Sequence, residues 1–585
     1  MSESTKAPGA GEARVTPART QTQTQTQAPD GNRTDDRNRT DDGNRTDQVD
    51  VLVIGAGVTG IYQLYRAREA GFSVKLLEAG DGVGGTWFWN RYPEARFDSE
   101  SYTYGYLFSK ELWEEWEWSE RFAGQPEIER YFNHVVDRFD LRRDIRFGAK
   151  VTSAVYDESA GTWTVRTGDG SELRARFVVA ATGILSVPFI PGIPGREDFR
   201  GEQHHTGLWP KTPVDFAGKR VAQIGTGSSG VQIVPAIADE VASLTVYQKV
   251  ADWLTPLNNG PITPEEQAEL KADFESIRET LNTSPSGFLH QIAMRSGLDD
   301  TEEQRQEFYE QRWNGPGFTK LSEHYMDMTT NPTVNAEWCE FIARKVRSIV
   351  KDPETAEKLI PKDHGYGGRR PPFGTGYYEA YNKPTVSLVD INETPITRIT
   401  ETGIETADGL REFDLIIWAT GYDFGTGALN RLGVRGRKGL PLEEYWGDGP
   451  LTYLGVATAG FPNFFFPGGP HGALGNNPRY SGDQVDFVID VLTYTRDFGH
   501  DVIEVDPAAE KEWTEMMDGS SSRSSFLQSS YFYGANIPGK PVKQLLNPTG
   551  RLTLQQMIAD AVENDYSAFA FSKTTRTTGT TEESE

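Results

Sequence analysis

The chain has 585 residues, a formal net charge of −26 at pH 7 and a single cysteine. One hydrophobic core rarely serves so many residues, so two or three domains are expected. The excess of acidic side chains excludes nucleic acid and anionic membranes as partners. A single cysteine excludes both a disulfide framework and a cysteine-based metal cluster.

The sequence shows neither a signal peptide nor an apolar run of membrane-spanning length, so we expect a cytoplasmic protein. Cys339 stands in a helical-looking Glu-Trp-Cys-Glu-Phe stretch, which favours a structural thiol over a nucleophile. The sequence predicts no metal site and gives no sign of an obligate protein partner.

Both ends of the chain are predicted to be disordered tails, at residues 1–49 and 571–585. The first holds a Thr-Gln repeat and three near-copies of Asn-Arg-Thr-Asp, and the second is rich in Thr and Glu. Such segments bury too little apolar surface to offset their ordering entropy. The Asn-Arg-Thr triplets match glycosylation acceptors, but in a cytoplasmic chain we interpret them as slipped repeats.

The first predicted strand, residues 49–54, is a short β-branched run typical of a buried parallel strand. It is followed by Gly55-Ala-Gly57-Val-Thr-Gly60, a predicted helix, and a second strand that ends at Glu78. These glycines allow a tight turn and a close approach of pyrophosphate to the helix N-terminus, while Glu78 is placed to bind a ribose. The pattern predicts a dinucleotide site.

Further short apolar strands are predicted at residues 177–182, 220–224, 244–248 and 415–419, alternating with helices. This alternation indicates an α/β fold with parallel sheets. Residues 256–362 are rich in Glu, Gln and Arg at helical spacing, and we expect a helical insertion there.

Residues 84–89, Gly-Gly-Thr-Trp-Phe-Trp, favour FAD over NAD at the first site, because small residues and aromatic faces suit the flavin side of the cofactor. A Trp-rich loop that only covers the core is the alternative. Two Ala-Thr-Gly turns, at 181–183 and 419–421, each follow a predicted strand. In flavoprotein reductases such turns approach the dinucleotides closely.

A second fingerprint, Gly225-Thr-Gly227-Ser-Ser-Gly230, follows the strand at 220–224 and opens another helix. The next strand ends in Gln248-Lys249 and has no carboxylate at the ribose position. A cation there suits the 2′-phosphate of NADPH, with Gln248 and Arg369 as further contacts. A solvated surface lysine is the alternative.

Between the fingerprints runs Phe199-Arg-Gly-Glu-Gln-His-His205-Thr-Gly-Leu-Trp-Pro210, which matches F-x-G-x-x-x-H-x-x-x-W-P in full. With this motif and both fingerprints, the chain resembles the Baeyer–Villiger monooxygenases from about residue 50 to about residue 550. The resemblance implies an FAD domain and an NADP domain with the motif as their hinge. His205, counted among the catalytic residues, would act through domain positioning; a satisfied core histidine is the alternative.

Three further segments carry the resemblance. The family signature G-x-W-x-x-x-x-Y-P-G-x-x-x-D runs from residue 85 to Asp98, with Glu94 in place of the usual glycine. Arg370 matches the catalytic arginine of the family, and Arg369 replaces a lysine that contacts the NADP phosphate in relatives. Residues 530–541 match S-W-x-x-G-A-N-x-P-G-K-P, with Tyr531 where a nicotinamide-contacting Trp is usual.

The resemblance implies that NADPH reduces FAD, and that the flavin then uses O2 to insert one oxygen atom beside a ketone, giving an ester or lactone. The permanently charged guanidinium of Arg370 would stabilise the negative charge that develops, and Asp98 would hold it in place. A structural ion pair or a phosphate contact is the alternative role for Arg370.

The implied order is an FAD-binding part at 50–190, an NADP-binding part at 191–255, the insertion at 256–362, a second NADP part at 363–390 and a second FAD part at 391–570. The residues assigned to cofactor binding are Gly55, Gly57, Thr59, Gly60, Glu78, Thr86, Trp87, Phe88, Trp89, Arg96, Phe97, Asp98, Tyr104, Val151, Gly225, Thr226, Gly227, Ser228, Ser229, Gly230, Gln248, Lys249, Arg369 and Tyr531.

The sequence specifies the substrate less closely than the fold, the cofactors or the reaction. The N-terminal repeats and the sequence of residues 58–65 most resemble those of actinomycete enzymes of pentalenolactone biosynthesis. This implies the ketone 1-deoxy-11-oxopentalenic acid and the product pentalenolactone D or its neo isomer, between which the sequence leaves the choice open. The alternatives are another cyclic or terpenoid ketone, flavin N- or S-oxygenation, and a degenerate FAD-binding protein.

Overall fold

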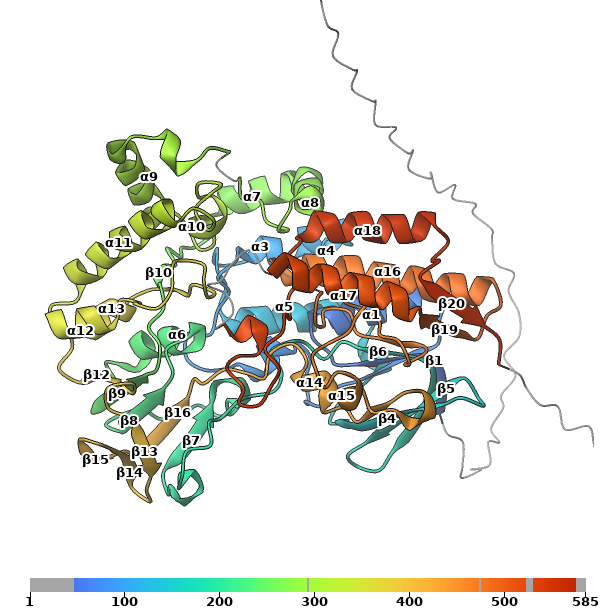
Figure 1. Cartoon of the computed structure of the whole chain (residues 1–585), viewed down its shortest axis with the longest axis horizontal. Helices are drawn as coiled ribbons and strands as arrows, with labels where there is room; N and C mark the ends of the chain where they lie inside the picture. Colours follow the sequence, from blue (N-terminus) through green and yellow to red (C-terminus); the bar gives the residue numbers. More distant parts are fainter. Residues whose placement is uncertain (1–46, 292–293, 473–474, 522–529, 575–585) are drawn as a thin grey trace, which may run out of the picture. The chain divides into compact units, whose positions relative to one another are not determined.

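Two large sheets organise the computed structural model, which describes residues 47–291, 294–472, 475–521 and 530–574 (Figure 1). The larger sheet has eight strands in the order β17-β4-β5-β6-β1-β2-β3, with β18 beside β6. Their bounds are β1 Asp47–Ile54, β2 Val74–Leu77, β3 Ile145–Arg146, β4 Val151–Asp157, β5 Thr162–Thr167, β6 Glu172–Ala180, β17 Val434–Arg435 and β18 Phe464–Phe465. Strands β4, β5 and β6 form an antiparallel meander, and the other pairs are parallel.

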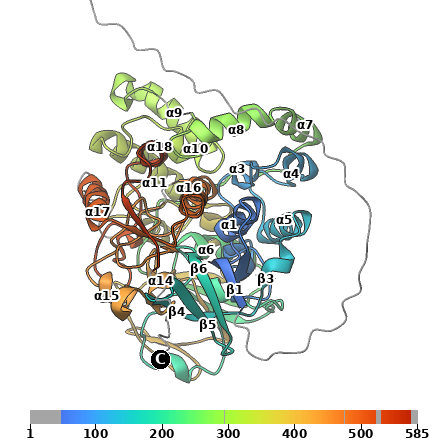
Figure 2. The same cartoon turned by 90° about the vertical axis from the view of Figure 1, so that its right-hand side faces the viewer.

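Alternate residues of β1 pack into different cores, because successive side chains of a strand point to opposite faces. Val51 and Val53 join the core formed with helices α1, α5 and α16, which Figure 2 shows around β1. Leu52 and Ile54 join the core on the other face, with α14 and α15. The helices are α1 Val58–Glu69, α5 Gln125–Arg138, α14 Gly427–Asn430, α15 Leu442–Tyr445 and α16 Asn477–Asp497. Burial on both faces explains the continuous apolar run of β1.

The second sheet is entirely parallel, in the order β12-β9-β8-β16-β7. Its strands are β7 Glu202–His205, β8 Arg220–Ile224, β9 Ser243–Gln248, β12 Val386–Asp390 and β16 Leu415–Trp418. Helix α6, Ser228–Ile237, covers one face, and the hairpin strands β13 Ile396–Ile399, β14 Gly403–Thr406 and β15 Gly409–Glu412 cover the other.

Three predicted boundaries are wrong. Strand β16 pairs with β8 and β7, so residues up to 418 belong with the second sheet, and the change of domain predicted at 391 comes too early. Strand β1 begins at Asp47, inside the predicted tail 1–49, because its pairing with β6 extends to Leu173. Strand β20, Phe569–Ser572, pairs with β19 and crosses the tail boundary predicted at 571. Residues 1–46 and 575–585 of the predicted tails lie outside the described residues.

The segment predicted as a helical insertion contains helices α7 Pro264–Ala272, α8 Phe274–Thr283, α9 Glu302–Asn314, α10 Thr319–Ser322, α11 Pro332–Ile349 and α12 Pro353–Lys358. Capping boxes at Thr263 and Thr301 begin α7 and α9 by satisfying their first backbone N–H groups. Cys339 lies in α11, where its sulfur accepts a hydrogen bond from the backbone N of Tyr366 and burial raises its thiol pKa to about 12. This environment suits the structural role predicted for it.

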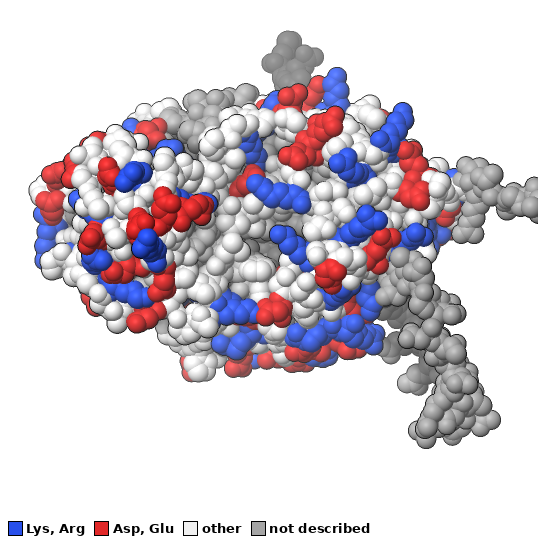
Figure 3. Space-filling model, turned by 90° about the horizontal axis from the view of Figure 1, so that it is seen from below, with Lys and Arg blue, Asp and Glu red and all other residues white. Residues whose placement is uncertain are grey.

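The remaining helices are α2 Thr86–Trp89, α3 Ser101–Tyr104, α4 Lys110–Glu115, α13 Tyr377–Ala380, α17 Pro507–Ser521 and α18 Arg551–Glu563, and the remaining strands are β10 Thr255–Pro256, β11 Phe373–Gly374 and β19 Val502–Val505. No helix in the described ranges is long and apolar enough to cross a bilayer. On the face seen in Figure 3, basic and acidic side chains are interspersed, so the net charge is not gathered there into one patch.

Candidate functional site

The first glycine fingerprint forms a tight cradle between β1 and α1. Gly55 has a φ of +102°, and a Cβ at Gly60 would lie 1.8 Å from the carbonyl oxygen of Gly55. Helix α1 begins after Gly57 with no side-chain cap and no acidic residue in its first turn. Its free N–H groups and positive dipole end therefore suit a phosphate.

Glu78, at the end of β2, supports this cradle. Its two carboxylate oxygens accept hydrogen bonds from the backbone N of Ala56 and of Gly80, each at 2.7 Å. Burial raises its pKa, against the lowering effect of these bonds. A carboxylate has further lone pairs, so a ribose hydroxyl can still bind. Val151 begins β4 close by, since the backbone N of Ala149 donates to the carbonyl of Glu78.

The second fingerprint repeats this construction between β8 and α6. Gly225 has a φ of +107°, and a Cβ at Gly230 would lie 2.5 Å from the carbonyl oxygen of Gly225. Gly227 faces open space instead, and α6 starts after it without a side-chain cap or an acidic residue. Thr226 anchors the turn by donating to the carbonyl of Val250 at 2.9 Å.

Both Ala-Thr-Gly turns pack against these cradles. A Cβ at Gly55 would lie 2.6 Å from the carbonyl of Ala181, and one at Gly225 would lie 2.3 Å from that of Ala419. Each turn therefore fixes the first glycine of one fingerprint. The two cradles, each with a bare helix N-terminus, fit the diphosphates of two dinucleotides.

The aromatic segment after the first cradle is partly structural. Phe88 is 4% exposed and fills the space above Gly80 and Gly82, where a Cβ would lie within 2.8 Å of its ring. Trp87 donates from Nε1 to the hydroxyl of Tyr104 at 3.1 Å and packs edge-on against Phe97 at 4.9 Å. Two other residues of the segment were predicted to contact the cofactor: Thr86 is exposed, and Trp89 packs on Phe88. Thr59, which was also predicted to do so, lies in α1 beside Gly468.

Arg370 joins the two halves of the site. Its guanidinium forms an ion pair with Asp98 and donates to Ser228 Oγ at 3.3 Å, in the first turn of α6. Burial has the largest single effect and works against the charge on Arg370, but Asp98, Tyr531 and Asp252 together outweigh it, so the pKa of Arg370 is raised. Tyr531 lies close enough for the guanidinium to influence its pKa, which burial raises to about 12.

Arg96 was predicted to contact a cofactor, and in the structure its guanidinium contacts two carboxylates. It forms ion pairs with Glu120 at 2.7 Å and with Glu94 at 2.5 Å. Glu94, which replaces the usual glycine, adopts a φ of +62°. The left-handed backbone typical of glycine is therefore kept by a residue whose carboxylate holds Arg96.

The predicted hinge motif is part of the second sheet. Gln203 and His205 lie in its edge strand β7, and Trp209 is buried in the adjoining core. His205 Nδ1 accepts from the backbone N of Gly207 at 2.9 Å, and its ring packs edge-on against Tyr422. Burial lowers the pKa of His205 to about 4, against the opposing effect of the backbone carbonyls of Gly421 and Phe189. His205 is thus a buried residue of the second sheet, far in sequence from the Arg370 pair.

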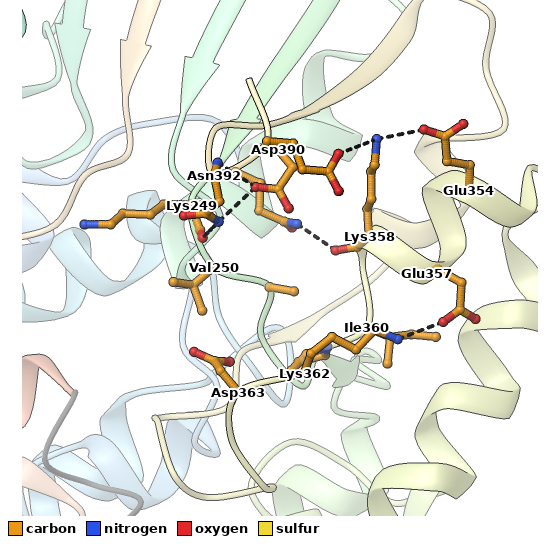
Figure 4. Close-up of a pocket in the computed structure, with 14 residues that line it drawn as sticks. Lys249, Val250, Glu354, Glu357, Lys358, Ile360, Lys362, Asp363, Asp390 and Asn392 are labelled. Carbon is orange, nitrogen blue, oxygen red and sulfur yellow. Dashed lines mark hydrogen bonds and ion pairs between the residues drawn. The ribbon is translucent and has the colours of Figure 1, made fainter. Parts of the chain in front are cut away.

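Two of the predicted 2′-phosphate residues, Gln248 and Lys249, line a cavity of about 600 Å³ at the carboxyl ends of β9 and β12 (Figure 4). Gln248 is held there, because its amide donates to the carbonyl of Lys358 at 2.7 Å. Lys358 pairs with Glu354 at 2.8 Å, whereas Figure 4 shows the side chain of Lys249 extended away from this pair. Arg369 reaches the cavity through Asp363, which lines it, at 3.6 Å.

Phe318 is a site residue that sequence reasoning missed. The guanidinium carbon of Arg370 lies 5.1 Å from the centroid of its ring. The feature of the sequence that could have pointed to Phe318 is the Gly315-Pro-Gly317 turn just before it, which interrupts a helical segment. A Cβ at Gly317 would lie 2.7 Å from the carbonyl oxygen of Asp98, so glycine allows this close approach.

Comparison with known proteins identifies the family. A model described as pyridine nucleotide-disulphide oxidoreductase matches residues 52–286. The 2-oxo-Delta(3)-4,5,5-trimethylcyclopentenylacetyl-CoA monooxygenase of Pseudomonas putida is 41% identical over 518 residues, covering 87% of this chain and 94% of the relative. Cyclopentanone 1,2-monooxygenase of Comamonas sp. is 40% identical over 528 residues, covering 89% and 96%. The chain belongs to the Baeyer–Villiger monooxygenase family.

Solved structures of Baeyer–Villiger monooxygenases share the fold. The OTEMO complex with FAD and NADP has a TM-score of 0.86 at 40% identity, covering 90% of this chain and 99% of that one. A closed structure of cyclohexanone monooxygenase has a TM-score of 0.88 at 40% identity, covering 90% and 100%. The predicted α/β fold with FAD and NADP domains, the enzyme class and its two cofactors are confirmed at the level of the family.

One relative is named for a different oxygenation. Phenazine N-monooxygenase of Lysobacter antibioticus is 39% identical over 524 residues, covering 89% of this chain and 96% of the relative. Similarity of this extent therefore does not by itself distinguish a ketone substrate from a nitrogen heterocycle.

Proposed function

We propose that this Baeyer–Villiger monooxygenase binds FAD at the first cradle and NADPH at the second, and inserts one oxygen atom from O2 beside the carbonyl of a cyclic ketone. The balance is ketone + O2 + NADPH + H+ giving lactone + H2O + NADP+. The observation that carries the proposal is the position of Arg370, whose guanidinium contacts Asp98 on one side and Ser228 of the second cradle on the other.

Arg370 supplies the fixed positive charge of the site. When bound, reduced FAD provides the activation of O2, and the negative charge that develops on the substrate oxygen needs a preorganised cation. A guanidinium keeps its charge at any working pH, and Asp98 and Phe318 hold it on two sides. Asp98 is therefore proposed as its anchor, and His205 as a structural residue of the second sheet.

Lys249 and Arg369 are proposed to favour NADPH over NADH. Lys249 lines the cavity beyond β9, and Arg369 pairs with Asp363, which also lines it. The adenosine end of a dinucleotide binds at this place in this type of fold. Replacing either with Ala should raise KM for NADPH about 10-fold or more, because a charge-assisted contact is lost. Steady-state kinetics with both nicotinamides measure this, and an equal rise of KM for NADH would contradict the assignment.

Product analysis under labelled oxygen tests the reaction class. With a cyclic ketone, NADPH and 18O2, the lactone should carry one labelled oxygen atom. The second candidate, N-oxygenation, is favoured by the phenazine relative, and parallel reactions with a phenazine and a sulfide separate the two. An N-oxide formed in preference to a lactone would overturn the proposal.

For the substrate we propose a polycyclic terpenoid ketone bearing a carboxylate, specifically 1-deoxy-11-oxopentalenic acid, with pentalenolactone D or its neo isomer as product. The support is the likeness of residues 58–65 and of the N-terminal repeats described above. Two relatives are named for five-membered ring ketones, cyclopentanone and a cyclopentenylacetyl-CoA. Comparing kcat/KM for this acid with that for cyclopentanone tests the proposal, which predicts that the acid is preferred.

A further inference from the structure

A buried histidine that the proposed reaction does not use lies between two segments of the site. His290 Nε2 is 2.8 Å from Glu100 Oε1, and its Nδ1 is 2.6 Å from Ser322 Oγ. The side chains of His290 and Glu100 are only 6% and 5% exposed. The three residues come from distant parts of the chain, so the imidazole ties together the segments that carry them.

The chemistry of the groups fixes the direction of the bond between His290 and Glu100. A carboxylate only accepts, so Nε2 carries a proton and donates to Glu100. Ser322 Oγ has one proton and also lies 2.9 Å from the carbonyl of Phe318. Whether that proton goes to Nδ1 or to the carbonyl, the hydroxyl stays engaged with His290.

Both segments lead directly to Arg370. Glu100 lies two residues after Asp98, the ion-pair partner of Arg370. Ser322 lies one helical turn after Phe318, whose ring packs against the same guanidinium. The carboxylate and the ring that flank Arg370 are thus tied, a few residues further along, to one imidazole.

Packing reinforces this connection. Phe288 stacks on the ring of His290 at 5.2 Å and on that of Phe318 at 5.4 Å. Gly317, beside Phe318, approaches the carbonyl of Asp98 too closely for a Cβ. The segment of Asp98 and the helical insertion therefore meet at Arg370, with His290 as their buried polar link.

We propose that His290 is a positioning residue: through Glu100 and Ser322 it holds Asp98 and Phe318 in register, and so orients the guanidinium of Arg370 for oxygen insertion. The inference rests on the proposed role of Arg370. Loss of the link leaves the NADPH-dependent reduction intact but diverts O2 to peroxide, with the balance O2 + NADPH + H+ giving H2O2 + NADP+.

The test compares His290→Phe and Ser322→Ala with the parent holoenzyme. Phenylalanine keeps the stacking on Phe288 but loses both hydrogen bonds, whereas Ser322→Ala keeps the bond to Glu100. Lactone formed per NADPH oxidised should fall about fivefold in the first and about twofold in the second, because misplacement of a charged group costs mainly the transition state. The rate of anaerobic flavin reduction should change less than about twofold.

His290→Gln provides the rescue, because its amide reaches toward Glu100, and it should recover part of the lost coupling. If His290→Phe fails to fold, Ser322→Ala decides alone. Unchanged coupling in the folded variants overturns the inference. Arg370→Ala distinguishes a failure of this inference from a failure of the proposed function. Coupling that survives in Arg370→Ala refutes the proposed function. Coupling that is lost in Arg370→Ala but kept in the His290 and Ser322 variants refutes only the role of His290.

Discussion

At the scale of single residues, Glu94 shows how the chain departs from its family without losing a turn. Its φ of +62° lies in the left-handed region, which costs a non-glycine residue about 1 kcal/mol. Its carboxylate contacts Arg96 at 2.5 Å, and an ion pair this exposed contributes at most about 1 kcal/mol. The two effects nearly cancel.

Glu94→Gly should therefore change the free energy of unfolding by less than about 1 kcal/mol, as measured by urea denaturation. Glu94→Val, which loses the ion pair and is β-branched in a left-handed conformation, should be the less stable variant by about 1 to 2 kcal/mol. Equal stability of the two variants would contradict this account of the backbone.

His205 is the second residue whose environment makes a definite prediction. Its folded pKa of about 4 lies below the ordinary value of 6.5, mainly because the ring is buried. Between these pH values the unfolded chain binds the proton and the folded chain does not. Stability is therefore lost as pH falls from about 6.5 to about 4, and is present above that range.

Between pH 4 and 6.5, His205→Gln should reduce the slope of the unfolding free energy against pH. The reduction should correspond to at most about one proton bound by the unfolded chain and not by the folded chain. The neighbouring His204→Gln serves as the matched control, since His204 pairs with Glu202 at the edge of the same strand. Denaturation curves recorded at several pH values measure both slopes. An unchanged slope in His205→Gln would show that folding does not lower the pKa of this ring.

At the scale of elements, two glycines at the N-terminus of α6 have different roles, one in the fold and one in leaving room for a pyrophosphate. Gly230 is needed by the fold, since a Cβ there would lie 2.5 Å from the carbonyl of Gly225. Gly227 faces open space with an ordinary φ of −76°, so the fold itself tolerates a side chain there. A pyrophosphate seated on the helix would not.

Gly227→Ala should therefore leave Tm within about 2 °C of the parent. No contact is lost, and the smaller conformational entropy of alanine in the unfolded chain offsets its weaker preference for the N-cap position. It should nevertheless raise KM for NADPH about 10-fold, by displacing the pyrophosphate from the helix N-terminus. Gly230→Ala should lower both Tm and activity. If Gly227→Ala binds NADPH normally, the diphosphate does not lie on α6.

The elements nearest each fingerprint were predictable, because strand, glycine turn and helix follow one another within about 30 residues. The place of β16 was not. It pairs with β8 across 194 residues, as the contact of Asp414 with Arg220 shows, and a buried apolar strand carries no mark of which sheet it joins. The domain boundary predicted at 391 fails for this reason.

At the scale of the whole molecule, the site is assembled by contacts far apart in sequence. Arg370 is 272 residues from Asp98 and 142 from Ser228. The pairing with Asp98 was predicted through family resemblance, because local pattern says nothing about such distances. The contacts with Phe318 and the link through His290 had no comparable signal, since they depend on how the helical insertion packs.

Arg370 is the cation proposed to serve oxygen insertion, and Arg369 offers a matched control on the same segment. Lactone formed per NADPH oxidised, measured for Arg370→Ala beside Arg369→Ala, tests it most directly. We predict that Arg370→Ala loses insertion by about 100-fold or more while still binding FAD, because one preorganised charge is removed. Arg369→Ala should mainly raise KM for NADPH. Full coupling in Arg370→Ala would show that this guanidinium does not serve oxygen insertion.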